Sequence, residues 1–100
     1  MPARLALDTA AIAAFCERHP IQKLALFGSV LRDDFHPGSD VDILVWFEPG
    51  ARVTLLDMVA MEQELTDIVG RKVDLRTPKE ISHYIRQRVL NEAEDLYVRG

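Results

Sequence analysis

The sequence predicts an α/β fold in which helices pack on a small β-sheet. Three short apolar runs, each ended by turn-forming residues, predict strands at 22–27, 41–47 and 72–76. Helical spacing of apolar residues alternates with these runs, at 8–18, at 54–69 and from 77 to the end of the chain, and a short helix is expected at 29–32. This alternation over 100 residues predicts one domain, residues 1–100, with helices layered on a sheet.

The strands are predicted from β-forming composition and from the residues that stop each run. The first run ends at Gly28, the second is rich in β-branched residues and ends at 48–50, which read Glu-Pro-Gly. The third, at 72–76, is too short for a helix and lies between Gly70 and the pair Thr77-Pro78. The intervening segment 33–39 concentrates turn formers and is expected to be a loop.

The helices are predicted from their capping residues. Asp8 is a candidate N-cap for the first helix, and Thr54 with Asp57 resembles a capping box for the second, which Gly70 would end. The last helix would begin at Thr77, with proline and glutamate at its first and third positions. Its apolar face would continue through five residues, Ile81, Ile85, Val89, Ala93 and Leu96.

Composition excludes several classes of function. Sixteen acidic residues outnumber twelve basic ones and neither half of the chain has a basic excess, so direct nucleic-acid binding is not expected. No apolar stretch approaches the roughly 20 residues that a membrane-spanning helix needs. The single cysteine, Cys16, has no partner for an internal disulfide, and the first residues do not resemble a secretory leader, so we expect a cytoplasmic protein.

Three aspartates stand out because strands are depleted of this residue. Asp40 and Asp42 flank the start of the second strand and share one face, while Asp74 lies within the third strand. Two carboxylates about 6 Å apart repel by roughly 3 kcal/mol at an effective dielectric constant of 20. A divalent cation would remove that cost, and ligands that are all oxygen favour Mg²⁺ or Mn²⁺.

The pair Gly28-Ser29 indicates a phosphate site. It ends one strand and precedes the short helix, so backbone N–H groups and the positive end of a helix dipole would face a bound phosphate. Arg32, one helical turn later, could reach the same phosphate or pair with a nearby carboxylate. A phosphate site beside paired carboxylates points to nucleotidyl or phosphoryl transfer.

The stretch Phe27–Val45, FGSVLRDDFHPGSDVDILV, resembles the signature of the DNA polymerase beta-like nucleotidyltransferase superfamily, in which Gly-Ser, ten residues and Asp-x-Asp follow one another. Val73-Asp74-Leu75 is similar to the later strand that carries the third carboxylate. Within that superfamily the chain resembles the minimal nucleotidyltransferases, the MntA-like antitoxins of HEPN/MNT toxin–antitoxin systems.

The resemblance implies a nucleotidyltransferase fold, a small mixed β-sheet flanked by helices, and transfer of AMP from ATP to a tyrosine of a cognate HEPN-domain toxin, an RNase that the modification silences. It implies two Mg²⁺ ions, with Mn²⁺ as a substitute, and a complex with that toxin. The residues expected to hold metal and to be catalytic are Asp40, Asp42 and Asp74. The residues expected to bind the nucleotide are Gly28, Ser29, Arg32 and Ser39.

Two alternatives to this function remain open at the level of sequence. The chain could neutralise a toxin by binding and masking it without catalysis, or it could transfer a nucleotide to a small molecule such as an aminoglycoside. Toxin neutralisation without nucleotide would support the first, and mass spectrometry of reaction products would support the second.

Overall fold

The computed structural model describes residues 7–28 and 40–99, in which four strands form one mixed sheet in the order β3-β2-β1-β4. The strands are β1 (Ile21–Phe27), β2 (Val41–Phe47), β3 (Val73–Arg76) and β4 (Glu94–Val98). β1 pairs antiparallel with β2 and with β4, whereas β2 pairs parallel with β3. The helices are α1 (Thr9–Arg18), α2 (Leu55–Val69), the 3₁₀ turn η2 (Pro78–Glu80) and α3 (Arg86–Glu92). The predicted mixed sheet flanked by helices is confirmed.

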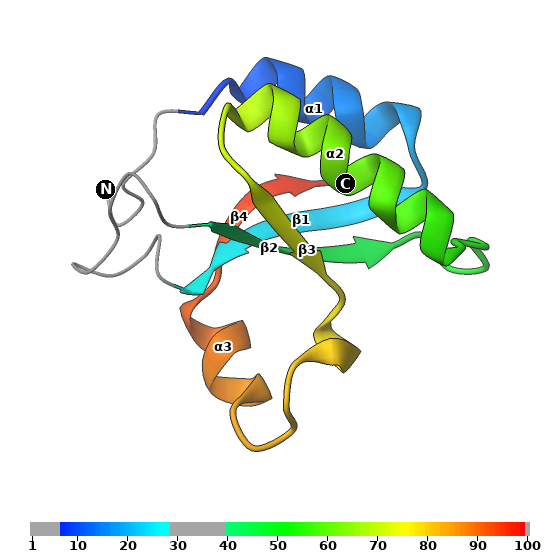
Figure 1. Ribbon diagram of the computed structural model, residues 1–100. Coiled ribbons are helices and arrows are strands. Elements are labelled where there is room, and N and C mark those ends of the chain that lie inside the picture. Colours follow the sequence, from blue (N-terminus) through cyan, green and yellow to red (C-terminus); the bar gives the residue numbers. More distant parts are fainter. Residues whose placement is uncertain (1–6, 29–39, 100) are drawn as a thin grey trace.

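Helices cover both faces of the sheet, as Figure 1 shows, with α1 and α2 on one side and α3 on the other. The larger apolar cluster lies under α1 and α2 and the smaller one under η2 and α3. β2 supplies both clusters because its side chains alternate: Val41, Ile43 and Val45 enter the larger cluster, and Leu44 enters the smaller one. Asp42 therefore lies on the face that η2 and α3 cover.

The predicted start of each of the first two helices is confirmed. The Asp8 carboxylate accepts from the backbone N–H of Ala11 at 3.0 Å. Thr54 and Asp57 form the reciprocal capping box, with N–H···O distances of 3.0 and 3.1 Å. Gly70 ends α2 in the left-handed conformation, at a φ of 79°.

The prediction of one helix from residue 77 to the end of the chain was wrong. The predicted cap at Thr77 forms, because Glu80 accepts from the backbone N–H of Thr77 at 3.0 Å. The helical turn that it begins is only the 3₁₀ turn η2, which ends at Glu80. The backbone is extended at Ile81, so the helix does not continue there. The Arg86 side chain binds back to this region and donates to the carbonyls of Pro78 at 2.9 Å and Ile81 at 3.0 Å. Only Arg86–Glu92 is α-helical.

Residues 94–98 form a strand, which the helical pattern did not predict. β1 is buried along most of its length, and without β4 it would leave a row of unpaired backbone groups at the sheet edge. Pairing of Leu24 with Tyr97 and Leu26 with Glu94 satisfies that edge. Ladder hydrogen bonds to a distant strand therefore overrode the local helical spacing.

None of the helices in residues 7–28 and 40–99 combines the length and the apolar character that crossing a bilayer requires.

Candidate active site

The candidate site begins where β1 ends and β2 starts. Gly28 follows β1 with a φ of 76°, in the left-handed region that favours glycine. The antiparallel register places Phe27 opposite Asp42, which brings the Asp42 side chain against the glycine. A Cβ at residue 28 would collide with Oδ2 of Asp42 and lie 3.2 Å from its Cγ. Because residue 28 is glycine, the Asp42 carboxylate can lie directly against the backbone at this end of the sheet.

Asp74 lies beside Asp42 on the neighbouring strand. The two residues are register partners in the parallel β2–β3 ladder. Val73 and Leu75 point into the larger apolar cluster, so Asp74 projects from the opposite face, the same face as Asp42. The side chain of Asp74 is 33% exposed, which leaves it open to a ligand. The structure thus places two of the three aspartates that the sequence singles out, Asp42 and Asp74, on the same face of neighbouring strands.

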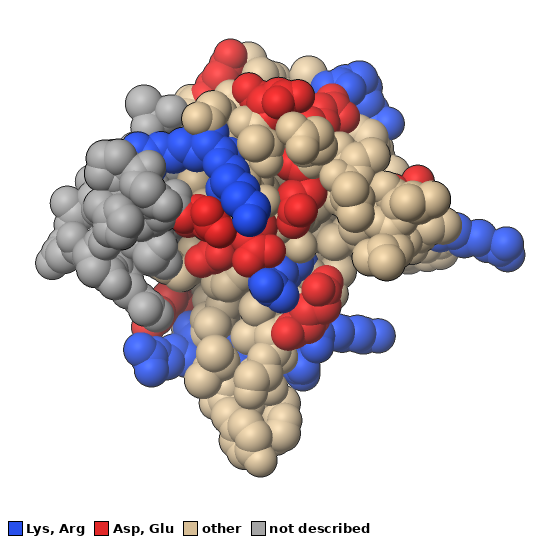
Figure 2. Space-filling model, viewed as in Figure 1, with Lys and Arg blue, Asp and Glu red and all other residues tan. Residues whose placement is uncertain are grey.

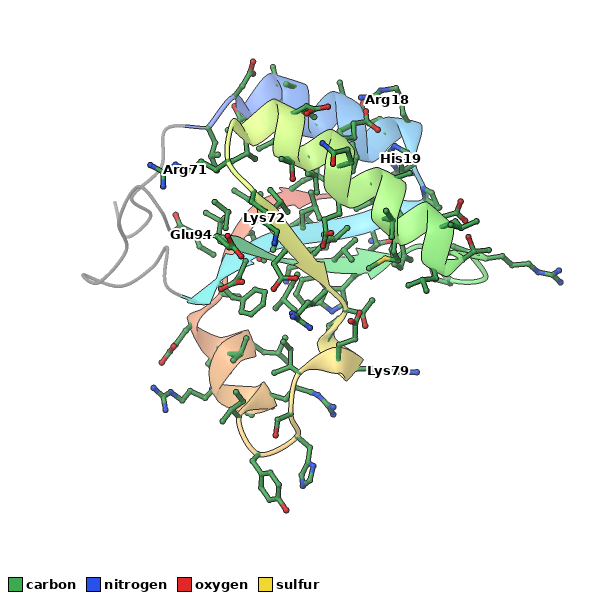
Figure 3. The ribbon with its side chains drawn as sticks, in the orientation of Figure 1. Arg18, His19, Arg71, Lys72, Lys79 and Glu94 are labelled. Atoms are coloured by element: carbon green, nitrogen blue, oxygen red, sulfur yellow. The ribbon has the colours of Figure 1, made fainter. Side chains whose placement is uncertain are left out.

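Asp40 lies at the same end of the sheet but makes a different contact. It immediately precedes β2 and is exposed, and its Oδ2 is 4.0 Å from Nζ of Lys72. The backbone holds these neighbours together, because Val41 N–H donates to the Lys72 carbonyl at 2.9 Å. Figure 3 shows Lys72 beside the first residues of β3. Within residues 7–28 and 40–99, no three His, Cys, Asp or Glu side chains are close enough together to hold a metal ion as they stand.

Arg76 is a member of the site that sequence reasoning missed. Its Nε and Nη2 donate to Oδ2 of Asp74 at 3.3 and 3.0 Å. The hydrogen bond and charge of Asp74 raise the pKa of Arg76, with smaller contributions from Glu80 and Asp42, so the guanidinium lies in the field of all three carboxylates. Strand alternation over 73–76 was the available signal, since it places Arg76 on the face of Asp74. The arginine offsets the repulsion between the two neighbouring aspartates.

Two side chains of α2 close the outer edge of β3. Glu62 accepts from the backbone N–H of Leu75 at 2.8 Å, and Thr66 accepts from that of Val73 at 3.0 Å. These N–H groups point away from β2 and would otherwise be unpaired at a sheet edge. The contacts fix α2 relative to Asp74.

A pocket of about 350 Å³ opens between α2, β3 and η2. Its lining residues are Leu55, Met58, Val59, Glu62, Asp74, Leu75, Arg76 and Glu80. In Figure 2 acidic side chains gather near the centre of this face, over β2 and β3, beside the uncharged surface of the first turns of α2. The pocket therefore joins the carboxylate site to an apolar surface.

Three predicted nucleotide-binding residues, Ser29, Arg32 and Ser39, lie outside the described residues, as do the predicted helix at 29–32 and the loop at 33–39. Gly28 and Asp40 are the described residues that border this segment on either side. Gly28 lies against the Asp42 side chain, and Asp40 is two residues before Asp42 in the chain.

The carboxylates fit a divalent cation by their chemistry. Asp42 and Asp74 offer hard oxygen donors side by side, the ligand type that Mg²⁺ and Mn²⁺ prefer. Asp74 would have to exchange its contact with Arg76 for the ion, and Asp40 its contact with Lys72. Mg²⁺ is commonly bound by one or two carboxylates together with waters and substrate phosphates, and the adjacent pair supplies that number.

Comparison with known proteins identifies the family. The family described as "Nucleotidyltransferase domain" matches residues 10–96. Protein adenylyltransferase MntA of Thermococcus cleftensis is 36% identical over 76 residues, which are 76% of this chain and 75% of the relative. The chain belongs to the nucleotidyltransferase domain family. The predicted resemblance and the prediction of a nucleotidyltransferase enzyme are confirmed.

Two solved structures share the fold. A toxin–antitoxin structure with AMP-PNP superposes with a TM-score of 0.73 at 23% identity, over 93% of this chain and 75% of that one. A complex of a tri-AMPylated Shewanella oneidensis HEPN toxin with its MNT antitoxin superposes with a TM-score of 0.65 at 22% identity, over 91% and 70%. At these identities the likeness establishes the fold alone.

Proposed function

We propose that this chain is an antitoxin that transfers AMP from ATP to a tyrosine hydroxyl of a cognate HEPN-domain toxin in the cytoplasm. The placement of Asp42 beside Asp74, with Asp42 against Gly28 at one end of the sheet, carries this proposal. The name of the Thermococcus relative and the AMPylated toxin in the Shewanella complex support the choice of a protein acceptor.

The reaction joins the tyrosine oxygen to the α-phosphorus of ATP and breaks the bond to the β-phosphate, so pyrophosphate leaves and the tyrosine proton is released. Asp40, Asp42 and Asp74 would hold Mg²⁺, with Mn²⁺ as a substitute. The ions would neutralise charge that develops on the phosphate oxygens. Asp74 would hold the second ion or accept the proton.

The triphosphate would lie at the Gly28 end of the sheet, where a backbone without a side chain permits close approach. Ser29, Arg32 and Ser39, which flank this end in the sequence, would complete the nucleotide site. Arg76, which gives up its contact with Asp74 to the ion, would still line the pocket under α2.

The test is transfer of ³²P from α-labelled ATP to the purified HEPN partner. Asp42→Asn keeps the shape of the side chain but removes its charge, and we expect labelling to fall by on the order of 10²-fold or more because a metal ligand is lost. Asp67→Asn is the matched control, since Asp67 is an exposed aspartate of α2 whose side chain contacts Gln63. Thermal unfolding of both variants checks that each is folded.

Equal labelling by Asp42→Asn and by the control would overturn the catalytic role of Asp42. Neutralisation of the toxin by Asp40→Asn/Asp42→Asn in the absence of nucleotide would instead support masking by contact. A nucleotide found on a small molecule rather than on the toxin would overturn the choice of acceptor.

A further inference from the structure

The first turns of α2 expose large apolar side chains that the core does not use. Leu55 is 80% exposed, Leu56 is 81% exposed and Val59 is 56% exposed. The buried residues of the same helix are Met61 and Leu65, further along and on the inner face. The capping box of Thr54 and Asp57 holds this first turn in helical geometry. The exposed leucines and the valine therefore form a defined surface, which we call the α2 patch.

The α2 patch continues directly into the pocket beside the proposed catalytic residues. Leu55 and Val59, one helical turn apart, line one wall of the pocket with Met58. Asp74 and Arg76 of β3 line the same pocket. A group seated in the pocket would therefore contact apolar side chains of α2 and a proposed catalytic carboxylate at the same time.

The size and chemistry of the pocket favour a side chain over a nucleotide. A volume of about 350 Å³ is at the small end for ligand sites. Among the described residues that line it, three are carboxylates (Glu62, Asp74 and Glu80) and one is a guanidinium (Arg76), so the charge of this lining repels a triphosphate and attracts a cation. The apolar wall suits an aromatic or branched aliphatic group.

We propose that the α2 patch and this pocket bind the acceptor segment of the protein substrate, which rests on the proposed function above. The segment has an apolar side chain next to the acceptor hydroxyl and a basic residue nearby. The apolar side chain packs between Leu55 and Val59, and the basic residue faces Glu80. This arrangement presents the hydroxyl to Asp74 from the α2 side while ATP approaches from the Gly28 side.

Binding is measured separately from catalysis by using the Asp42→Asn background, in which complex formation with the purified HEPN partner is followed by calorimetry without nucleotide. Val59→Glu replaces an apolar contact of the pocket with a charged side chain that the acceptor's apolar residue would have to bury, and we expect the dissociation constant to rise at least tenfold. Val98→Glu is the matched control, because Val98 is 55% exposed on β4, close to the 56% of Val59. We expect this control to stay within twofold of the parent.

The same substitutions in the active chain separate docking from chemistry. Val59→Glu should raise KM for the protein acceptor at least tenfold while kcat at saturating acceptor changes less than threefold, and Leu55→Ser should act in the same direction. Transfer by the active chain also tests the proposed function: if no AMP reaches the toxin, that function fails, yet the binding comparison still decides whether the α2 patch is a docking surface.

Unchanged affinity in Val59→Glu would overturn the proposal. Self-association of the chain through the α2 patch would also overturn it. That result would be a dimer of the free protein that Val59→Glu converts to a monomer, with toxin binding unchanged. Equal losses in Val59→Glu and Val98→Glu would also overturn it, because they would reflect net charge rather than the α2 patch.

Discussion

Gly28→Ala adds one methyl group at the point where the backbone of β1 meets the Asp42 carboxylate. The substitution has two separable consequences. Alanine is strained at a φ of 76°, and its Cβ collides with Oδ2 of Asp42. Gly50 provides the comparison, since it has nearly the same φ, 82°, and a Cβ there would meet nothing within 4 Å.

The expected magnitudes follow from these two contributions. A left-handed alanine costs about 1–2 kcal/mol, which both variants should lose from the free energy of unfolding. In Gly28→Ala the carboxylate must also move by about 1 Å to restore ordinary contact distances, and an off-rotamer aspartate costs roughly 0.5–1.5 kcal/mol more. We therefore expect a loss of about 1–2 kcal/mol in Gly50→Ala and about 1.5–3.5 kcal/mol in Gly28→Ala.

Activity should separate the two variants further than stability does. A displacement of about 1 Å in a reacting group can cost on the order of 10²-fold in rate. We expect Gly28→Ala to lose AMP transfer by about that factor and to bind Mn²⁺ more weakly, whereas Gly50→Ala keeps both. Urea unfolding gives the stabilities, and transfer is measured at a temperature where both variants are folded.

Equal transfer and equal Mn²⁺ affinity in the two glycine variants would refute the reasoning, because the contact between residue 28 and Asp42 would then have no consequence for the site. A Gly28→Ala chain no less stable than Gly50→Ala would refute the steric part alone.

The remaining predictions concern the arginine of the site, the buried thiol and a helix cap. Arg76→Gln should tighten Mn²⁺ binding by up to about fivefold in calorimetry, because the guanidinium no longer competes for Asp74, while Arg88→Gln on α3 should not. Burial raises the pKa of the Cys16 thiol from 9.0 to about 12, so a disulfide reagent at pH 8 should react only after unfolding, and stability should fall as pH rises from about 9 towards 12. Thr54→Ala should lower the unfolding free energy by about 1 kcal/mol in urea.

Each of these predictions has a contrary result. Unchanged or weaker Mn²⁺ binding in Arg76→Gln would show that the arginine does not oppose the ion. Rapid thiol labelling of the native chain would show that Cys16 opens to solvent. Full stability of Thr54→Ala would show that the capping box contributes nothing to α2.

Local signals in the sequence were sufficient for the first two helix starts and for three strands. Asp8 and the pair Thr54 and Asp57 act through hydrogen bonds to residues three positions away, so their effect does not depend on the rest of the fold. The face on which Asp42 lies was also predictable, since alternation along a strand is a property of the strand alone. The family signature, Phe27–Val45, includes Asp42 and could also be identified from the sequence alone.

The tertiary structure decided the end of the chain and the composition of the site. Residues 94–98 form a strand because the backbone groups at the edge of β1 need hydrogen-bond partners. β1 lies about 70 residues earlier in the sequence, so this requirement is not visible in residues 94–98 themselves. The parallel register that makes Asp42 and Asp74 neighbours, and the contact of Arg76 with that pair, depend on how β3 docks beside β2. The pocket between α2 and β3 forms only when side chains of α2 bind the backbone of β3. This contact could not be predicted locally, because the sequence pattern of α2 does not show which distant backbone groups lack partners.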